Sequence, residues 1–219
     1  VLFFATVFAK ANIRLPNVIS SNMVLQQQST VKLWGWSNPA EKIIVTTSWD
    51  NKTDSVVATR DAQWVLEIKT PDAGGPYSIV LKGENTIVLS NVLIGEVWIC
   101  SGQSNMEMND GWGGIPDIKA ALPGCANNRI RFFAVPQTTS LYPQDNCGGE
   151  WIHCDSNTLK AFSAVAYFFG RKINTTLNVP VGLISSNWGG TPAETWTEPS
   201  AIDNTPALKA AAAKLQPYD

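Results

Sequence analysis

The stretch Gly95-Glu-Val-Trp-Ile-Cys-Ser-Gly-Gln-Ser-Asn-Met-Glu-Met108 decides how this chain is organised. Its apolar run, Val97 to Cys100, stops abruptly at small and polar residues. Such a run predicts a buried strand that breaks into a tight turn, with a helix after it. Open α/β sheets place their chemistry at the carboxyl ends of their strands. One interpretation is that the hydroxyl of Ser104, which the turn leaves at the edge of the sheet, is functional. The alternative, which the turn taken alone favours, is a plain turn in which Ser104 caps the helix.

A second stretch repeats this pattern of a buried strand followed by a turn. The run from Val181 to Ser186 predicts a short buried strand, and it ends in Asn-Trp-Gly-Gly-Thr-Pro-Ala-Glu-Thr-Trp, residues 187–196. The paired glycines, Gly189 and Gly190, let a backbone approach a ligand closely. A tight loop without function is the alternative for this pair.

Both stretches resemble the sialate O-acetylesterase family of the SGNH (GDSL-type) hydrolases. The block Gly102-Gln103-Ser104-Asn105 takes the place of the Gly-Asp-Ser-Leu of that superfamily. The resemblance implies that Ser104 is the nucleophile and that its own backbone N–H is one oxyanion donor. It implies a second donor in the glycine turn, at Gly190 or else at Gly189. Three further residues are implied as support for the site: Gln103, Asn105 and Glu194.

Two parts of an SGNH site are missing from these residues. The family takes a third oxyanion donor from a later block and its base from an Asp-x-x-His-like block near the carboxyl end, and neither occurs here. The one histidine, His153, has no catalytic role in the resemblance. We therefore expect an amino-terminal fragment that is inactive alone, because a serine without an imidazole stays protonated and weakly nucleophilic.

The residues before Ser90 predict an all-β region. Short β-rich runs with turn residues between them are typical of an antiparallel sandwich, and they cover 31–36, 42–49, 55–59, 64–69, 77–81 and 86–89. The family has an amino-terminal β-domain that this region resembles, with Trp34-Gly35-Trp36 among the matches. Two roles are open for Trp34 and Trp36, packing in the core and a platform for sugar binding, and we favour packing.

The expected organisation has three parts. Residues 1–11 are a signal-peptide remnant, because they are apolar and end in Ala9-Lys10-Ala11. Residues 12–90 form the β-sandwich. Residues 91–219 form an α/β/α, flavodoxin-like SGNH hydrolase domain with a parallel sheet, which is truncated at its carboxyl end. Its clearest helix carries an apolar stripe that should face the core: Phe162, Val165, Ala166, Phe169 and Ile173.

Composition narrows the partners and the compartment. The 219 residues carry a net charge of −2 without any Lys/Arg run, which argues against nucleic acid, and no segment is long enough to span a membrane. The apolar start predicts export to the outside of the cell or the periplasm, or to a lysosome in a eukaryote. Export would permit disulfides, and Cys147 with Cys154 is the expected pair.

The function expected from the resemblance is a secreted esterase that removes O-acetyl groups from sugars, without metal or organic cofactor. Sialic acid and acetylated polysaccharides such as xylan are alternative substrates. A non-catalytic carbohydrate-binding protein is the alternative from another class. Glu107 and Asp110 suggest glycoside hydrolysis only weakly, because Glu107 also fits the capping of a helix start. The oligomeric state is left open, and we expect a sheet with an uncovered apolar edge to make the chain unstable.

Overall fold

The computed structural model describes residues 12–140, 142–208 and 210. It is mixed α/β, and the described residues form an eight-stranded sheet with parallel and antiparallel strands and a separate two-stranded sheet. The expected signal remnant and most of the Ala-rich tail lie outside the described residues. In that described part, no helix is both long and apolar enough to cross a membrane.

The amino-terminal half is all β, as the alternating pattern predicts. The strands are β1 (Val24–Gln26), β2 (Thr30–Trp36), β3 (Lys42–Thr47), β4 (Thr53–Val57), β5 (Gln63–Lys69) and β6 (Gly74–Lys82). Strand β2 pairs with β5, and β4, β3 and β6 join the large sheet. One buried cluster contains side chains from both sheets: Leu33 of β2 and Trp64 of β5, with Ile43 of β3 and Leu81 of β6. The two sheets therefore pack face to face.

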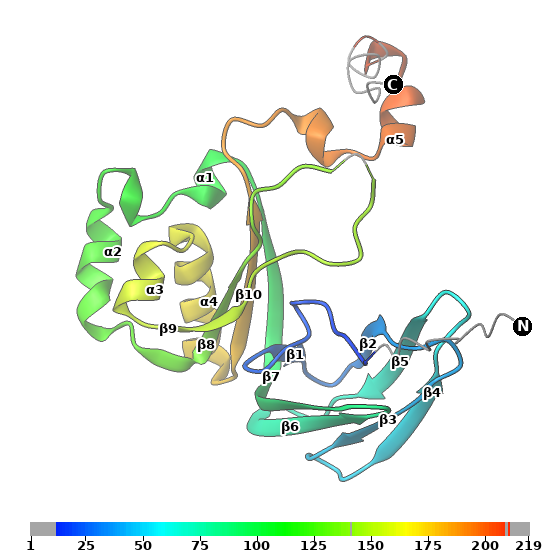
Figure 1. Ribbon diagram of the computed structural model, residues 1–219. Coiled ribbons are helices and arrows are strands. Elements are labelled where there is room, and N and C mark those ends of the chain that lie inside the picture. The colour runs from blue at the N-terminus through cyan, green and yellow to red at the C-terminus, as the bar shows by residue number, and fades with distance from the viewer. Residues whose placement is uncertain (1–11, 141, 209, 211–219) are drawn as a thin grey trace, which may run out of the picture.

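Strand β7 (Thr86–Gly102) connects the two halves (Figure 1). Its first part pairs with β6 and its second part runs parallel to β10 (Val181–Asn187). The boundary expected at residue 90 therefore falls inside a continuous strand. Strand β10 is also parallel to β8 (Asn127–Ala134), to which β9 (Trp151–Cys154) is antiparallel. The four residues of β9 are too few to show a strand pattern in the sequence.

Helices cover one side of the parallel strands (Figure 1). They are α1 (Ser104–Glu107), α2 (Pro116–Ala121), α3 (Ser156–Lys160) and α4 (Ala164–Leu177), with α5 (Pro199–Asp203) beyond β10. Short 3-10 turns lie at Asp110–Trp112, Leu122–Gly124, Ala193–Trp196 and Pro206–Leu208. A second buried cluster joins Ile118 of α2, Leu159 of α3 and Tyr167 of α4 to Phe132 and Leu183 of the sheet.

The face of α4 that meets the sheet differs from the predicted stripe. Val165 is 50% exposed and Phe169 is 40% exposed, whereas Tyr167 and Gly170 are buried. The reason is the close approach of the helix at Gly170, where an added Cβ would lie 2.6 Å from Leu183 Cδ1. The exposed ring of Phe169 packs on Trp98 of β7 with 5.0 Å between centroids.

The four cysteines are free, so the expected Cys147–Cys154 disulfide is wrong. Cys147 packs against the cluster of the β-rich half, whereas Cys154 belongs to the cluster under the helices. The Cys154 thiol instead donates to the Cys125 carbonyl oxygen over 3.2 Å, and burial raises its pKa to about 12. Seven residues separate the two cysteines in sequence, but the sheet separates their side chains.

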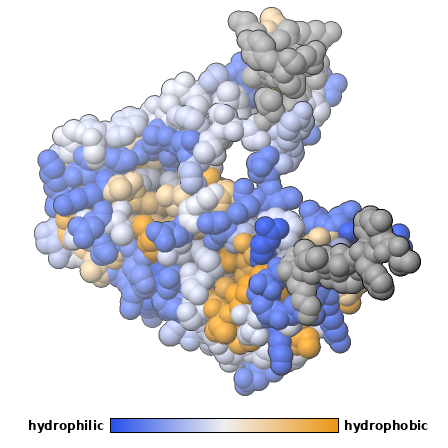
Figure 2. Space-filling model, in the orientation of Figure 1, coloured by the Kyte–Doolittle hydropathy of each residue, from blue (hydrophilic) through white to orange (hydrophobic). Residues whose placement is uncertain are grey.

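Apolar side chains on the face drawn in Figure 2 gather over the strands, mostly in the lower, β-rich half. The tryptophans of β2 belong to this half. Trp34 packs against its core, and the Arg14 guanidinium lies 5.9 Å from the centre of the Trp36 ring. Trp64 is fully buried in the same core. Packing thus accounts for these rings, as favoured from the sequence.

Candidate active site

The turn after β7 presents Ser104 at the carboxyl edge of the sheet. Gly102 has a φ of +144°, a conformation that side-chain-bearing residues rarely adopt, and it turns the chain out of the strand. Gln103 follows, and Ser104 opens α1 as its first residue, half-buried. Because Gln103 occupies the cap position without a side-chain cap bond, the alternative of Ser104 as the helix cap is wrong.

The glycine turn after β10 lies directly against this turn. Asn187 pairs in register with Gly102, and the Trp188 N–H donates to the Gly102 carbonyl over 3.1 Å. A Cβ added to Gly189 would lie 3.0 Å from Ser104 Oγ. The two stretches quoted from the sequence, more than eighty residues apart, thus form one site because their strands are neighbours in the sheet.

Side chains from both sides of Ser104 hold the glycine turn in place. The Glu107 carboxylate accepts a short hydrogen bond from the Gly189 N–H, and its other oxygen accepts from Gln137 Nε2 over 2.8 Å. The Gln103 side chain donates to the carbonyl oxygen of Thr191. This contact is consistent with the supporting role expected for Gln103. The supporting contacts of Glu107 and Gln137 were not predicted from the sequence. Glutamate three residues after the serine was the available signal, and it was interpreted as capping.

Two backbone N–H groups of these turns are available to bind a ligand oxygen. Gly189 uses its N–H on Glu107, whereas the N–H groups of Ser104 and Gly190 donate to no acceptor among the described residues. Gly190 has a φ of +78°, which a glycine adopts without strain. This arrangement favours Gly190 over Gly189 as the second donor, the order expected from the resemblance.

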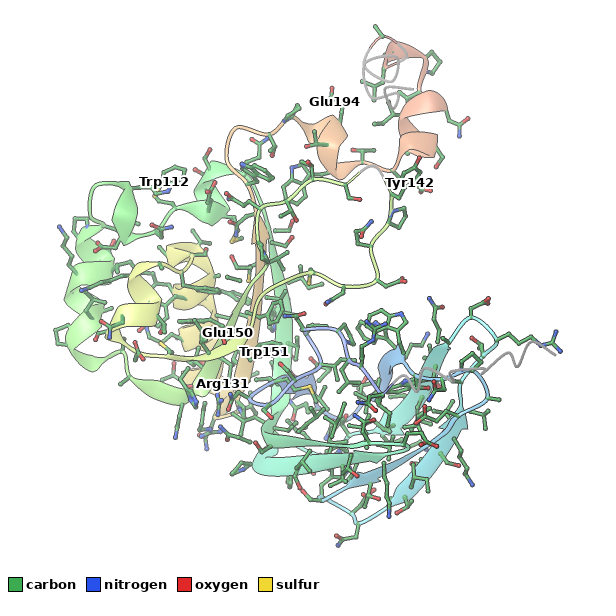
Figure 3. The ribbon with its side chains drawn as sticks, in the orientation of Figure 1. Trp112, Arg131, Tyr142, Glu150, Trp151 and Glu194 are labelled. Carbon is green, nitrogen blue, oxygen red and sulfur yellow. The ribbon has the colours of Figure 1, made fainter. Side chains whose placement is uncertain are left out.

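The other expected support residues make fewer contacts. Asn105 is exposed, and within the described ranges its side chain forms no hydrogen bond. Glu194 lies in the 3-10 turn Ala193–Trp196, above the sheet (Figure 3), and its carboxylate binds no described residue. The roles implied for both residues stay predictions.

His153 is remote from the serine. It lies on β9 and pairs with Arg131 of β8. Arg131 pairs in turn with Gly182 of β10, which pairs with Val97 of β7. Strand spacing and rise place His153 on the order of 20 Å from Ser104. A general base must come within hydrogen-bond reach of the hydroxyl, so His153 does not serve Ser104. In the part of the chain described, no cluster of His, Cys, Asp or Glu has the arrangement of a metal site.

A pocket of about 250 Å³ opens beside the glycine turn. Two tryptophans line it, Trp188 and Trp196, together with the polar groups of Gln137 and Asn187. Trp196 is 45% exposed, and its indole N–H donates to Thr191 Oγ1 over 2.7 Å, which fixes the ring next to the turn. Aromatic faces beside hydrogen-bonding groups suit the apolar and polar faces of a sugar ring.

Comparison with known proteins agrees with this geometry. No family model matches the chain. A solved carbohydrate acetylesterase from Xanthomonas citri superposes on 94% of it with a TM-score of 0.83 and 32% identity, and 46% of that protein is covered. The fold is therefore similar to that of a carbohydrate acetylesterase.

The curated relatives of this chain identify its family more narrowly. Sialate O-acetylesterases from Homo sapiens and Pongo abelii are each 31% identical over 207 residues, which cover 84% of this chain and 38% of each relative. The chain is a homologue of the sialate O-acetylesterases, and the resemblance seen in the sequence is confirmed. It spans well under half the length of the relatives it matches.

Proposed function

We propose that this chain supplies the nucleophile and two oxyanion donors of a carbohydrate O-acetylesterase. Ser104 Oγ attacks the carbonyl carbon of a sugar-bound acetyl group. The negative charge on the carbonyl oxygen is stabilised by the N–H groups of Ser104 and Gly190. The bond between the carbonyl carbon and the sugar oxygen then breaks, and the sugar oxygen receives the proton that a base took from Ser104. Water hydrolyses the acetyl-enzyme, which releases acetate and restores the Ser104 hydroxyl. The observation that carries the proposal is the position of Gly189 against Ser104, with its N–H bound to Glu107.

The proton from Ser104 needs a base that the described residues do not place near it. We propose that an imidazole from a later Asp-x-x-His-like block takes this role, as in the SGNH arrangement. The parallel order β7–β10–β8 with helices on one side supports an SGNH-type domain, and the paired sheets before it support a β-sandwich. Export to the cell exterior or periplasm is part of the proposal and rests on the composition of residues 1–11.

The substrate proposed is an acetylated sugar held in the pocket of Trp188 and Trp196. The relatives' names point to sialic acid or to other carbohydrates, so we propose that O-acetyl sialic acid and acetylated xylan be compared directly. Faster hydrolysis of one of them identifies the substrate class.

Fluorophosphonate labelling of the full-length protein tests the nucleophile. We expect labelling and acetyl-ester hydrolysis, both lost on Ser104→Ala. Ser101→Ala is the matched control, because Ser101 is an exposed serine at the end of the same strand, and it should label normally. Labelling that persists in Ser104→Ala contradicts the proposal. Binding of acetylated glycans without labelling or hydrolysis would favour a non-catalytic binding protein.

A further inference from the structure

A buried arginine without an acidic partner lies at the opposite end of the sheet from Ser104. Arg131 of β8 is 1% exposed (labelled in Figure 3). Its neighbours Ile130 and Phe132 face the helices, so Arg131 points toward the β-rich half. A buried guanidinium is costly unless an opposite charge compensates it.

None of the hydrogen-bond partners of Arg131 is a carboxylate. Its Nε donates to the Asn128 carbonyl over 2.7 Å, Nη2 donates to the Asn91 side-chain amide over 3.3 Å, and Nη1 lies 3.4 Å from His153 Nε2. With none of the described carboxylates does Arg131 form an ion pair. Burial also lowers the pKa of Arg131, because removal from water disfavours the charged guanidinium.

A pocket of about 320 Å³ adjoins this guanidinium. A second arginine lines it, Arg129, which is half-buried and donates to Asn178. The other lining residues are Gly74, Gly75, Pro76, Asn91, Leu93, Asn128 and Pro180, and none of them is acidic. The volume is at the lower end of the range for small-molecule sites.

We propose that this pocket binds an oxyanion, a phosphate, sulfate or carboxylate group, between Arg129 and Arg131. The anion supplies the missing counter-charge, and a poorly solvated guanidinium interacts with it more strongly than an exposed one. The bound group belongs either to a free inorganic anion or to an acidic sugar. The site lies at the end of the strands away from Ser104, so it does not depend on the proposed esterase activity.

Thermal unfolding of the full-length protein tests the site, with inorganic phosphate and glucuronate as probes. At ten times its dissociation constant, a bound anion should raise Tm by about 1–3 °C over sodium chloride of equal ionic strength, because the shift for a given binding free energy falls with the size of the protein. A response to phosphate alone identifies a free anion, and a response to glucuronate alone identifies an acidic sugar. A rise with both identifies a general oxyanion site. No rise with either probe overturns the proposal.

Variants locate the effect. Arg131→Met should abolish the response, and Arg129→Gln should weaken binding at least about tenfold, because a charge-assisted hydrogen bond is lost. Arg171→Gln is the matched control, since Arg171 stacks on Phe168 of α4 outside the pocket, and it should respond like the wild type. An unchanged response in Arg129→Gln overturns the proposal, and this variant decides the question even if Arg131→Met does not fold.

Discussion

At the scale of single residues, the proposed nucleophile Ser104 lies against a glycine that has no room for a side chain. A Cβ on Gly189 would lie 2.7 Å from Glu107 Oε2 and 3.0 Å from Ser104 Oγ. Gly189→Ala must therefore displace the glycine turn, and we expect turnover of an acetyl ester to fall by roughly 10²–10³ while Tm changes little. Gly124→Ala is the control, because nothing lies within 4 Å of a Cβ there. Full activity in Gly189→Ala would show that the turn does not serve Ser104.

A second prediction at this scale concerns which carboxylate holds the glycine turn. Glu107 binds the Gly189 N–H and Gln137, whereas the resemblance implies Glu194. Glu107→Gln keeps an acceptor but loses its charge, so we expect kcat to fall about tenfold with KM unchanged. Glu107→Ala should lose more, and Glu194→Ala should lose less than either. Steady-state kinetics of the three variants decide, and a larger loss in Glu194→Ala would contradict the assignment.

At the scale of elements, a histidine on β9 and the aspartate that caps α3 determine how the free energy of unfolding should depend on pH. Burial, together with the nearby Arg131, lowers the pKa of His153 below its usual 6.5. Backbone N–H groups of Thr158 and Asn157, which the Asp155 cap of α3 accepts, lower the pKa of Asp155 below its usual 3.8. In both cases the pKa is higher in the unfolded chain than in the folded protein. Each group's contribution to stability is therefore complete above the unfolded pKa and is lost as pH falls through the folded pKa.

We therefore expect acid to destabilise the protein in two stages, the first below about pH 6.5 from His153 and the second below about pH 3.8 from Asp155. Denaturant unfolding as a function of pH measures this. His153→Asn should flatten the first stage only. Asp155→Asn should reduce the second stage only in part, because a hydrogen bond from Thr47 also lowers the pKa of Asp50 below 3.8. A first stage that survives in His153→Asn would assign it to another group.

At the scale of the whole molecule, the upper part of β7 is an open edge. Strand β10 pairs on one side of Glu96–Gly102, and the other side has no strand among the described residues. On this open side, the Val97 N–H donates to Gln26 Oε1 over 2.9 Å. Ile99 is 72% exposed and Trp98 is 42% exposed. An apolar open edge is a template for pairing with another chain.

We expect this 219-residue chain to self-associate through that edge. Ile99→Lys should shift it toward monomer in sedimentation velocity, because a charge on an edge strand opposes pairing. Leu177→Lys, at an exposed position at the end of α4, should leave association unchanged. A wild-type chain that melts cooperatively as a monomer at high concentration would contradict both this prediction and the expected instability.

Local pattern determined much of this protein. The apolar run before Ser104 forms the strand and turn that it predicts, the alternating runs of residues 31–89 form strands, and the helix continues through Gly170 to Leu177. These features depend on backbone preferences and on burial along a few neighbouring residues. That the block around Ser104 and the block around Gly189 belong to one site was implied by the family resemblance, and these local patterns alone did not predict it.

Only the tertiary structure decided the rest. Gly189 meets Glu107 because β7 and β10 are in register, and Arg131 meets Asn91 of β7 and His153 of β9 because the strand order of the sheet brings both strands close to β8. The free thiol of Cys154 and the inward face of α4 likewise depend on which elements pack together. A contact between residues far apart in the chain is set by strand order and register, which no short stretch of sequence encodes.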